Sequence, residues 1–523
     1  MKTKRWTMKT PPRIIYNDDS ASINVIQPPI TPERIYLAVD HLAGSQVDCL
    51  CWKVYRRFTA GWDSKVCETE HEMYFAGQTD PNHKANHMRY DLYRQGIDYM
   101  PILIEETRKR GIQFFPSFRM NDCHHRSRPG DAAQFWKDHQ DWRLWEILDG
   151  RTYYNAALDY SHQEVRDNIF AAIEEFTNKY DVDGIELDFC RNPYTFQPSE
   201  AWEKREILTD FIRRIRHMTT NVAERRGRSV TLLVRVPFSD EKRQRAGMDV
   251  NQWIDEKLFD ILVMSHLKNN YDLTLEPWRT RCRENNILFY PSLEAGPLDN
   301  APAHNHVVRE PPEEVVRRQR AAAQNIHAQG ADGIYMFNYP CLLFGSGIDE
   351  LEFKKLNRVL SEIGDPETLR GTPKQFVFWQ NLPITVESRR PPQFYQTVTF
   401  HVRDPDLEKE DTNVRIGFRQ VAEANPHAKG TPEHSAAIGL EWMKYLLNGT
   451  EIDIRHIECA PRPAGQIQSG FTLPEHEFIE IRLPSSMLKN GENTLAFHVP
   501  KFPEDHDPYF HIYELLVDVE PGK

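Results

Sequence analysis

The sequence of 523 residues predicts a (β/α)8 barrel followed by an antiparallel β-sandwich. Strand-like runs alternate with helix-like runs through the first two-thirds of the chain, and eight such strands can be counted. After about residue 365 the helical pattern stops, and short β-rich segments separated by turn residues follow. We therefore expect an N-terminal extension over residues 1–34, a barrel over 35–365 and a sandwich domain over 374–523.

The expected barrel strands are short apolar runs that lie between helical segments or turn residues. They cover residues 47–55, 111–118, 153–160, 183–189, 230–238, 259–267, 287–296 and 332–340. Each strand except the last is followed by a helical or helix-containing segment. This order is typical of a ring of parallel strands that is surrounded by helices.

Three helices are predicted by clear signals. Ser161 and Glu164 form a capping-box pattern, and apolar residues then recur at helical spacing. The apolar spacing of residues 203–226 predicts a second, long helix, and Pro311 and Pro312 are expected to open a third. The C-terminal region differs, because its segments are short and rich in β-branched and aromatic residues. The turns "LNGTE" and "LKNGEN" within it are typical of hairpins.

The composition is that of a globular protein, with 40% hydrophobic and 27% charged residues. No stretch of about 18 apolar residues is present that could span a bilayer. The net charge of -12 is spread along the chain, which disfavours nucleic acid and anionic membrane as partners. The basic N-terminus lacks the apolar core of a signal peptide, so we expect a cytoplasmic location. The sequence carries no signal for an oligomeric state.

Eight cysteines occur without a C-x-x-C pair or regular spacing, which favours free thiols in a reducing compartment. Cys49 and Cys51 lie two apart on an expected strand and would share one face of it. We expect them in the core rather than in a metal site.

The stretch "VDGIELDFCRNPYTF" (182–196) places two carboxylates in an otherwise apolar strand. Alternate residues of a barrel strand face the lumen, so Glu186 and Asp188 are expected to point inward while their apolar neighbours pack against helices. Asp188 is the nearer of the two to the C-terminal mouth, where barrel enzymes keep their active sites. The pair therefore indicates chemistry, a bound cation, or a buried ion pair with a residue such as Arg235.

Polar residues also occupy the C-terminal ends of other expected strands, where they would line one polar cavity. A lone histidine is more often structural than functional, so only the whole set indicates a site. The set comprises Arg119, Asn121, Asp122, His124, His125, Arg191, Arg235, His266, Glu294, Asn338 and Tyr339. Aromatic residues near the same mouth suit the apolar faces of sugar rings, and these are Trp52, Trp62, Tyr194 and Tyr339.

A resemblance adds to this interpretation. The blocks "RIIYNDDS", "QVDCLCWKVY", "FFPSFRMNDCHH", "LDYSHQEVRD" and "DGIELDFCRNP" are similar to those of bacterial family-10-like glycosyl hydrolases. The resemblance extends over roughly residues 12–365 and implies a TIM barrel with glycosidase-type chemistry on a carbohydrate, without indicating which one. The Asn-Glu-Pro triplet of the large glycosidase clan with its acid/base on the fourth strand is absent here.

The leading hypothesis is cleavage of a glycosidic bond by two carboxylates, with Asp188, Glu294 and Glu186 as the catalytic candidates and no cofactor. The remaining mouth residues, together with Trp52, would bind substrate, and their arginines and histidines hint at an acidic sugar. One alternative is a divalent-metal enzyme with Asp122, His124, His125 and Asp188 as ligands. Another is a barrel that binds carbohydrate without cleaving it. The sandwich would be an accessory, carbohydrate-binding-like module.

Overall fold

The computed structural model describes most of the chain. The described residues are 10–26, 29–78, 90–127, 129–146, 155–190, 192–266, 272–294, 311–339, 350–378, 382–387, 396–423, 443–462, 465–466, 472–473, 476–500 and 509–522. The chain divides into two compact units. The first unit comprises residues 1–268, 275–295 and 331–353, and the second comprises 269–274, 296–330 and 354–523.

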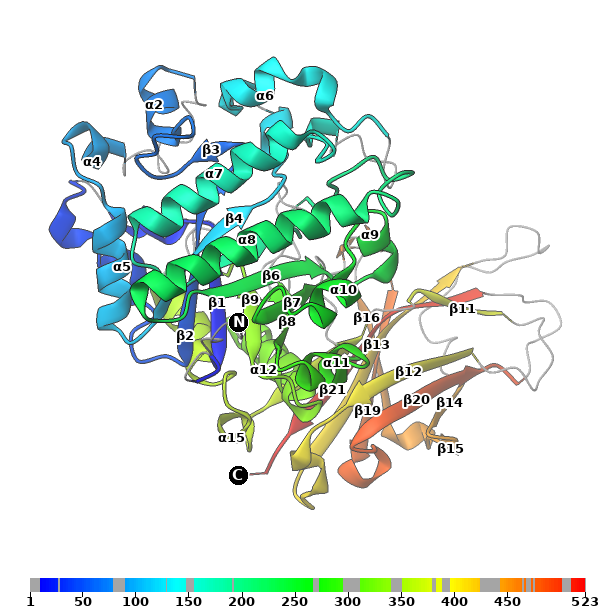
Figure 1. Cartoon of the computed structure of the whole chain (residues 1–523). Helices are drawn as coiled ribbons and strands as arrows, with labels where there is room; N and C mark the ends of the chain where they lie inside the picture. Colours follow the sequence, from blue (N-terminus) through cyan, green and yellow to red (C-terminus); the bar gives the residue numbers. More distant parts are fainter. Residues whose placement is uncertain are drawn as a thin grey trace. The chain divides into compact units, whose positions relative to one another are not determined.

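The first unit is a closed barrel of eight parallel strands, in the order β1-β2-β4-β5-β6-β7-β8-β9 (Figure 1). The ring closes because β1 pairs with β2 on one edge and with β9 on the other. The strands are β1 (Ile14–Asp18), β2 (Val47–Arg56), β4 (Gln113–Arg119), β5 (Gly184–Asp188), β6 (Thr231–Pro237), β7 (Ile261–Ser265), β8 (Leu288–Glu294) and β9 (Ile334–Phe337). A short strand β3 (Thr59–Ala60) pairs antiparallel with the end of β2. The predicted fold class is confirmed.

The sequence-based count misses one strand and contains one strand too many, and these two errors compensate. Strand β1 lies inside the range that the sequence assigns to an N-terminal extension. Residues 155–160 form no strand, and Leu158 makes only an isolated bridge to Arg143. The side chain of Asn121 hydrogen-bonds both the N–H and the carbonyl of Leu158, so this segment is held as a loop. Strands β5 and β8 remain the fourth and seventh of the barrel.

Apolar residues at alternate positions of the strands fill the lumen. The cluster consists of Ile15, Cys49, Cys51, Phe115, Leu233, Ile261, Val263, Tyr290, Tyr335 and Phe337. Because the side chains of a strand alternate, this cluster fixes which residues of each strand face inward. Cys49 and Cys51 share one face of β2 and belong to this core.

Aspartates at the N-terminal ends of the strands stabilise the barrel. Asp48, Asp183, Asp260 and Asp332 each accept a hydrogen bond from a backbone N–H of the neighbouring strand, at distances of 2.8 to 3.0 Å. A glycine follows two of these aspartates, Asp183 and Asp332, because a side chain there would clash. A Cβ on Gly184 would lie 2.5 Å from the Phe115 ring, and one on Gly333 would lie 2.5 Å from the Tyr290 ring. These features belong to stability rather than to chemistry.

Helices surround the ring, and Figure 1 shows the two longest of the first unit, α7 and α8, side by side on its outer face. The helices of the first unit are α1 (Leu37–Asp40), α2 (Glu70–Phe75), α4 (Tyr90–Arg94), α5 (Met100–Lys109), α6 (Gln134–Asp138), α7 (Gln163–Lys179), α8 (Arg205–Arg226), α9 (Asp240–Gln244), α10 (Val250–Asp255) and α11 (Trp278–Glu284). As predicted, α8 ends at Gly227, which takes the left-handed conformation with φ of 67°. The predicted capping box does not form, because α7 begins at Gln163 with His162 as its N-cap residue. Within the described residues, no helix is both long and apolar enough to cross a bilayer.

The second unit contains two main antiparallel sheets around one apolar core, which confirms the predicted sandwich. One sheet has β10 (Lys374–Phe378), β11 (Ile384–Glu387), β13 (Asn413–Glu423), β16 (Ile457–Arg462), β19 (His476–Pro484) and β21 (Tyr509–Glu520), and the other has β12 (Gln396–Val402), β14 (Lys444–Leu447), β15 (Thr450–Glu451) and β20 (Gly491–His498). A small ribbon pairs β17 (Gly465–Gln466) with β18 (Thr472–Leu473), and the helices are α12 (Pro312–Ala328), α14 (Glu350–Asn357), which begins in the first unit, and α15 (Pro366–Leu369). Helix α12 precedes β9 in sequence but groups with this unit, where Arg318 donates to Gln375 of β10 at 2.6 Å.

Candidate active site

Glu186 on β5 faces the lumen and is fully buried. Its Oε2 accepts a hydrogen bond of 2.8 Å from Nδ2 of Asn17 on β1, and its Oε1 accepts one from the hydroxyl of Tyr335 on β9. Strands β1 and β9 stand on the opposite side of the ring from β5. These hydrogen bonds therefore cross the lumen, and both oxygens of Glu186 have partners.

Asp188 lies two residues further along β5, toward the mouth. Its Oδ1 accepts hydrogen bonds from Nη1 of Arg235, at 3.0 Å, and from the backbone N–H of Cys190, at 2.9 Å. Its Oδ2 is buried and, among the residues that the structure describes, has no hydrogen-bond partner. The ion pair with Arg235 is the structural alternative that the sequence raised, but it accounts for only one of the two oxygens.

Arg235 is itself held on three sides. It is fully buried on β6, and its Nη2 donates to Oγ of Ser265 on β7 at 2.8 Å. Its guanidinium carbon lies 3.7 Å from the centroid of the Phe337 ring on β9, which is a close cation–π contact. A charge fixed in this way also fixes the carboxylate that it binds.

The environment of Glu186 favours its protonated form. Burial, followed by the negative charge of Asp188, raises its pKa from 4.5 to about 7, although hydrogen bonds from Ser117 and Tyr335 and the charge of Arg235 act in the opposite direction. The deeper carboxyl therefore changes its protonation near neutral pH.

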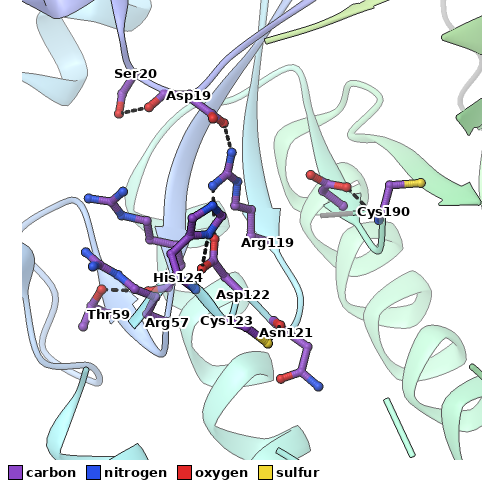
Figure 2. A network of polar contacts seen from close by, with 12 residues as sticks. Asp19, Ser20, Arg57, Thr59, Arg119, Asn121, Asp122, Cys123, His124 and Cys190 are labelled. Atoms are coloured by element: carbon purple, nitrogen blue, oxygen red, sulfur yellow. Dashed lines mark hydrogen bonds and ion pairs between the residues drawn. The ribbon is translucent and has the colours of Figure 1, made fainter. Parts of the chain in front are cut away.

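A second polar network joins the ends of β1 and β4 (Figure 2). Arg119 contacts Asp19 and donates to Oδ2 of Asp122 at 3.1 Å, and Nδ1 of His124 lies 2.7 Å from Oδ1 of Asp122. Burial raises the pKa of Asp122, but His124 and Arg119 outweigh it and hold this pKa well below its usual range. For Arg119 burial lowers the pKa, but the carboxylates of Asp19, Asp122 and Asp188 outweigh burial and raise this pKa above its usual range. Figure 2 shows Arg119 between the carboxylates of Asp19 and Asp122.

Asn121 has a structural part at the mouth. Its Nδ2 donates to the carbonyls of Leu158 and Tyr194, both at 2.9 Å, and its Oδ1 accepts from the Leu158 N–H. These bonds join the connection after β4 to the connection after β5. Asn121 thus shapes the mouth through the backbone.

The two predicted histidines outside the Asp122 network pack against aromatic rings. His125 is fully buried with its ring 4.3 Å from that of Trp136, and His266 stacks on Phe238 at 4.3 Å. Burial lowers the pKa of each to about 4, so both are neutral at pH 7. A neutral imidazole offers an acidic sugar no charge.

The remaining predicted residues differ in position. Trp52 is fully buried on the face of β2 opposite Cys51 and the lumen cluster, which is not where a sugar-stacking residue would lie. Asn338 takes a left-handed conformation with φ of 55°, and its N–H donates to the carbonyl of Asn17 at 3.1 Å. Tyr339 is buried, with its ring edge-on to that of Tyr16 at 6.1 Å.

Two predicted site residues stay predictions. Glu294 is the last residue of β8, where its backbone pairs with Phe337, but its side chain lies outside what is described. Arg191 lies outside the described residues. The part of β8 that is described places position 294 at the C-terminal end of the seventh barrel strand.

Four further residues on these strands and connections were not predicted from the sequence. Asn17, Ser265 and Tyr335 bind the two carboxylates or Arg235. Asn192, four residues after Asp188, is buried, and neither polar atom of its amide is hydrogen-bonded within the described chain. The alternation within "IIYND" and "IYMF" was the available signal for Asn17 and Tyr335.

The four candidate metal ligands of the alternative hypothesis do not form one cluster. Asp122 binds His124, whereas Asp188 binds Arg235 and His125 packs on Trp136. In the described chain, no group of three or more histidine, cysteine, aspartate or glutamate side chains is arranged to hold a metal ion.

The comparison with protein families agrees with the fold. Residues 21–205 match the family Glycosyl hydrolase-like 10. This range holds β2, β4 and β5 with both carboxylates, and it confirms the predicted resemblance over that part of the chain. No curated protein matches the chain. The family match supports a carbohydrate-active hydrolase as the broad class.

Solved glycosidase structures resemble the chain weakly. An α-L-fucosidase from Paenibacillus thiaminolyticus is 12% identical with a TM-score of 0.41, over 70% of this chain and 51% of that one. The glycoside hydrolase domain of PgaB from Bordetella bronchiseptica is 10% identical with a TM-score of 0.41, over 67% and 99%. An α-galactosidase from Geobacillus stearothermophilus is 12% identical with a TM-score of 0.37, over 95% and 56%. The chain thus spans about half the length of the fucosidase.

Replacing Glu186 tests its protonation through stability. Its pKa is higher in the folded protein than the ordinary value of 4.5, so its stabilising contribution is complete below about pH 4.5 and is lost as pH rises through about 7. Glutamine imitates the protonated form, and Asn17, whose Oδ1 has no hydrogen-bond partner in the described chain, can turn its amide to accept from it. We expect the melting temperature of Glu186→Gln to fall less between pH 5 and pH 8 than that of the parent.

Comparing the parent with Glu186→Gln separates the contribution of Glu186 from those of the other titratable groups. Burial also raises the pKa of Asp18 to about 7, and this residue contributes with the same sign in both proteins. Equal falls of the melting temperature in parent and variant would contradict the proposed protonation of Glu186.

Proposed function

We propose that the barrel hydrolyses a glycosidic bond in an oligo- or polysaccharide, with Asp188 as a reacting carboxylate. The observation that carries this proposal is the buried Oδ2 of Asp188, which finds no hydrogen-bond partner in the described chain. A buried carboxylate oxygen without a partner costs free energy, and such groups concentrate at functional sites. The position of Asp188 at the C-terminal end of a barrel strand adds support.

The second carboxyl group in this proposal is Glu294. It ends β8, three strands along the ring from β5, and the alternation of the strand would give position 294 the same orientation as the lumen residue Tyr290. Asp188, paired with Arg235, would act as nucleophile or as base for water, and Glu294 would protonate the leaving oxygen. A separation of about 5–5.5 Å between the two carboxyl groups would give retention, and about 6.5–9.5 Å would give inversion.

Glu186 would act by positioning Asp188 rather than by reacting. Both of its oxygens are already bound across the lumen by Asn17 and Tyr335. Its carboxyl lies one inward-facing position below Asp188, so its protonation state changes the field at the reacting group. A protonated Glu186 adds no second negative charge beside Asp188.

The substrate would be recognised mainly without charge. Arg119 contacts Asp19 and Asp122, and Arg235 contacts Asp188, so both arginines are matched by carboxylates. His125 and His266 are neutral at pH 7 because of burial. Selectivity for an acidic sugar would therefore depend on Arg191.

Substitution of the two carboxylates tests the reaction. Asp188→Asn and Glu294→Gln should each lower kcat by about 10³-fold or more, because each removes a group needed in the transition state. Turnover would be measured on a panel of aryl glycosides and on neutral and acidic polysaccharides, with product analysis. Far-ultraviolet circular dichroism and thermal melting would verify that each variant is folded.

Two outcomes would contradict this assignment. Near-normal turnover of Asp188→Asn would remove Asp188 from the reaction, and near-normal turnover of Glu294→Gln would transfer the second role to another carboxyl such as Glu186 or Asp122. Binding of oligosaccharide by a folded parent that releases no product from any substrate would favour a carbohydrate-binding protein instead.

Tyr335→Phe tests the positioning layer. The hydroxyl of Tyr335 lowers the pKa of Glu186, so its removal should move the corresponding limb of the kcat profile to higher pH and reduce kcat by about tenfold. Tyr290→Phe is the matched control, since this lumen tyrosine donates instead to the backbone carbonyl of Pro12 at 2.7 Å. Both variants should lose about 1–2 kcal/mol of stability, because each leaves a buried group without its hydrogen bond.

The pH profile separates the two tyrosines. If Tyr290→Phe shifts the profile as much as Tyr335→Phe does, the effect is structural and Glu186 is not a positioning residue.

A further inference from the structure

Two tryptophans of the first unit are exposed at the mouth side of the barrel. Trp145 is 72% exposed and Trp202 is 42% exposed, which makes them the most exposed tryptophans among the described residues. Trp145 belongs to the connection that follows β4, and Trp202 belongs to the connection that follows β5. Both connections leave the C-terminal ends of their strands, where the candidate active site lies.

Hydrogen bonds hold the two connections together beside these tryptophans. Glu146 accepts from both the backbone N–H, at 3.0 Å, and the hydroxyl of Ser199. Gln197 accepts through Oε1 from the N–H groups of Trp145, at 3.1 Å, and of Glu146, at 3.3 Å. Trp145 directly precedes Glu146, and Trp202 follows Ser199 by three residues. The two aromatic residues are thus presented on one rim.

Further hydrogen bonds between these two connections lie closer to the strand ends. Asn121, two residues after β4, donates to the carbonyl of Tyr194, and the N–H of Tyr160 donates to the carbonyl of Thr195 at 2.7 Å. The connection that contains Tyr194 and Thr195 begins immediately after Asp188. The rim is therefore continuous with the segment that carries the reacting carboxylate.

The ring surroundings distinguish these tryptophans from a structural one. Trp142, on the same connection, packs against two rings, those of His139 at 3.8 Å and of His162 at 4.4 Å. Within the described chain, no ring or cation is placed on Trp145. Trp202 carries the guanidinium of Arg205 at 4.9 Å, which covers one of its two faces.

We propose that Trp145 and Trp202 form a rim that binds the sugar chain of a polymeric carbohydrate beyond the bond that is cleaved, a role that rests on the proposed function. Sugar rings present apolar C–H faces between their hydroxyl groups, and an indole matches such a face with a large, rigid surface. An exposed indole face is in contact with water, and a bound sugar chain would remove this apolar area from water. The substrate is then a chain of several sugars rather than a short glycoside.

Affinity electrophoresis of the full chain tests the rim without requiring turnover. The parent for this test is Asp188→Asn, which should not degrade the probe, run in native gels that contain hydroxyethyl cellulose, xylan, glycol chitosan or polygalacturonate. We expect retardation in at least one gel, and Trp145→Ala and Trp202→Ala in this background should each weaken binding by about tenfold. Thermal melting of each variant would verify folding.

Tyr36→Ala is the matched control. Tyr36 is 39% exposed and has the guanidinium of Arg110 at 5.9 Å, but Arg110 follows α5 and precedes β4, at the N-terminal end of the barrel. This control should migrate like its parent in every gel.

The outcomes separate the rim from the catalytic proposal. Retardation of both tryptophan variants equal to that of the parent, or no retardation of the parent in any gel, would overturn the rim. Hydrolysis is measured separately on the wild-type chain, so binding that depends on the tryptophans together with failure to release product would overturn the proposed function alone.

Discussion

Closure of the barrel by β1 is the constraint on which the candidate site depends. All five residues of Ile14–Asp18 are buried and pair with β2 on one edge, and the first three of them pair with β9 on the other. Without this strand the sheet would have two open edges, and the lumen would lose part of its wall opposite β5. The same strand supplies Asn17 to Glu186, and the residue after it supplies Asp19 to Arg119. Fold and site thus depend on the same short segment.

The aspartates at the two ends of the barrel strands have different surroundings. At the N-terminal ends, carboxylates such as those of Asp183 and Asp332 accept hydrogen bonds from backbone N–H groups of neighbouring strands. At the C-terminal ends, Asp188 keeps an oxygen that no described residue binds. Both sets are aspartates next to apolar strands, so residue type alone does not separate them. Their position along the strand does, because the connections that form a mouth leave only from the C-terminal ends.

Much of the fold and part of the candidate site could be predicted from the sequence. The same physical rules explain which predictions were wrong. The inward orientation of Glu186 follows from the strict alternation of a strand, and the hydrogen bonds to Asn17 and Tyr335 across the lumen confirm it. The prediction that Trp52 binds substrate is wrong by one position of that alternation, since Trp52 lies on the face of β2 opposite Cys51. Strand β1 was not predicted because it is only five residues long, follows two prolines and is too short for a clear alternation of apolar and polar residues. Asn121 was expected to bind substrate, but a polar side chain at a strand end can equally hold a loop backbone, and only the fold decides between the two.

The charges at the mouth explain why recognition would depend on shape more than on electrostatic attraction. A buried arginine without a counter-charge is costly, and here Arg119 is matched by Asp19 and Asp122, and Arg235 by Asp188. Pairing fixes the geometry of Asp188, but it also cancels the positive field that would attract an anionic sugar. In the proposed function, selectivity among neutral chains would then come from hydrogen bonds and from contact area. The exposed indoles of Trp145 and Trp202 provide such area on the segments that begin at these same strand ends.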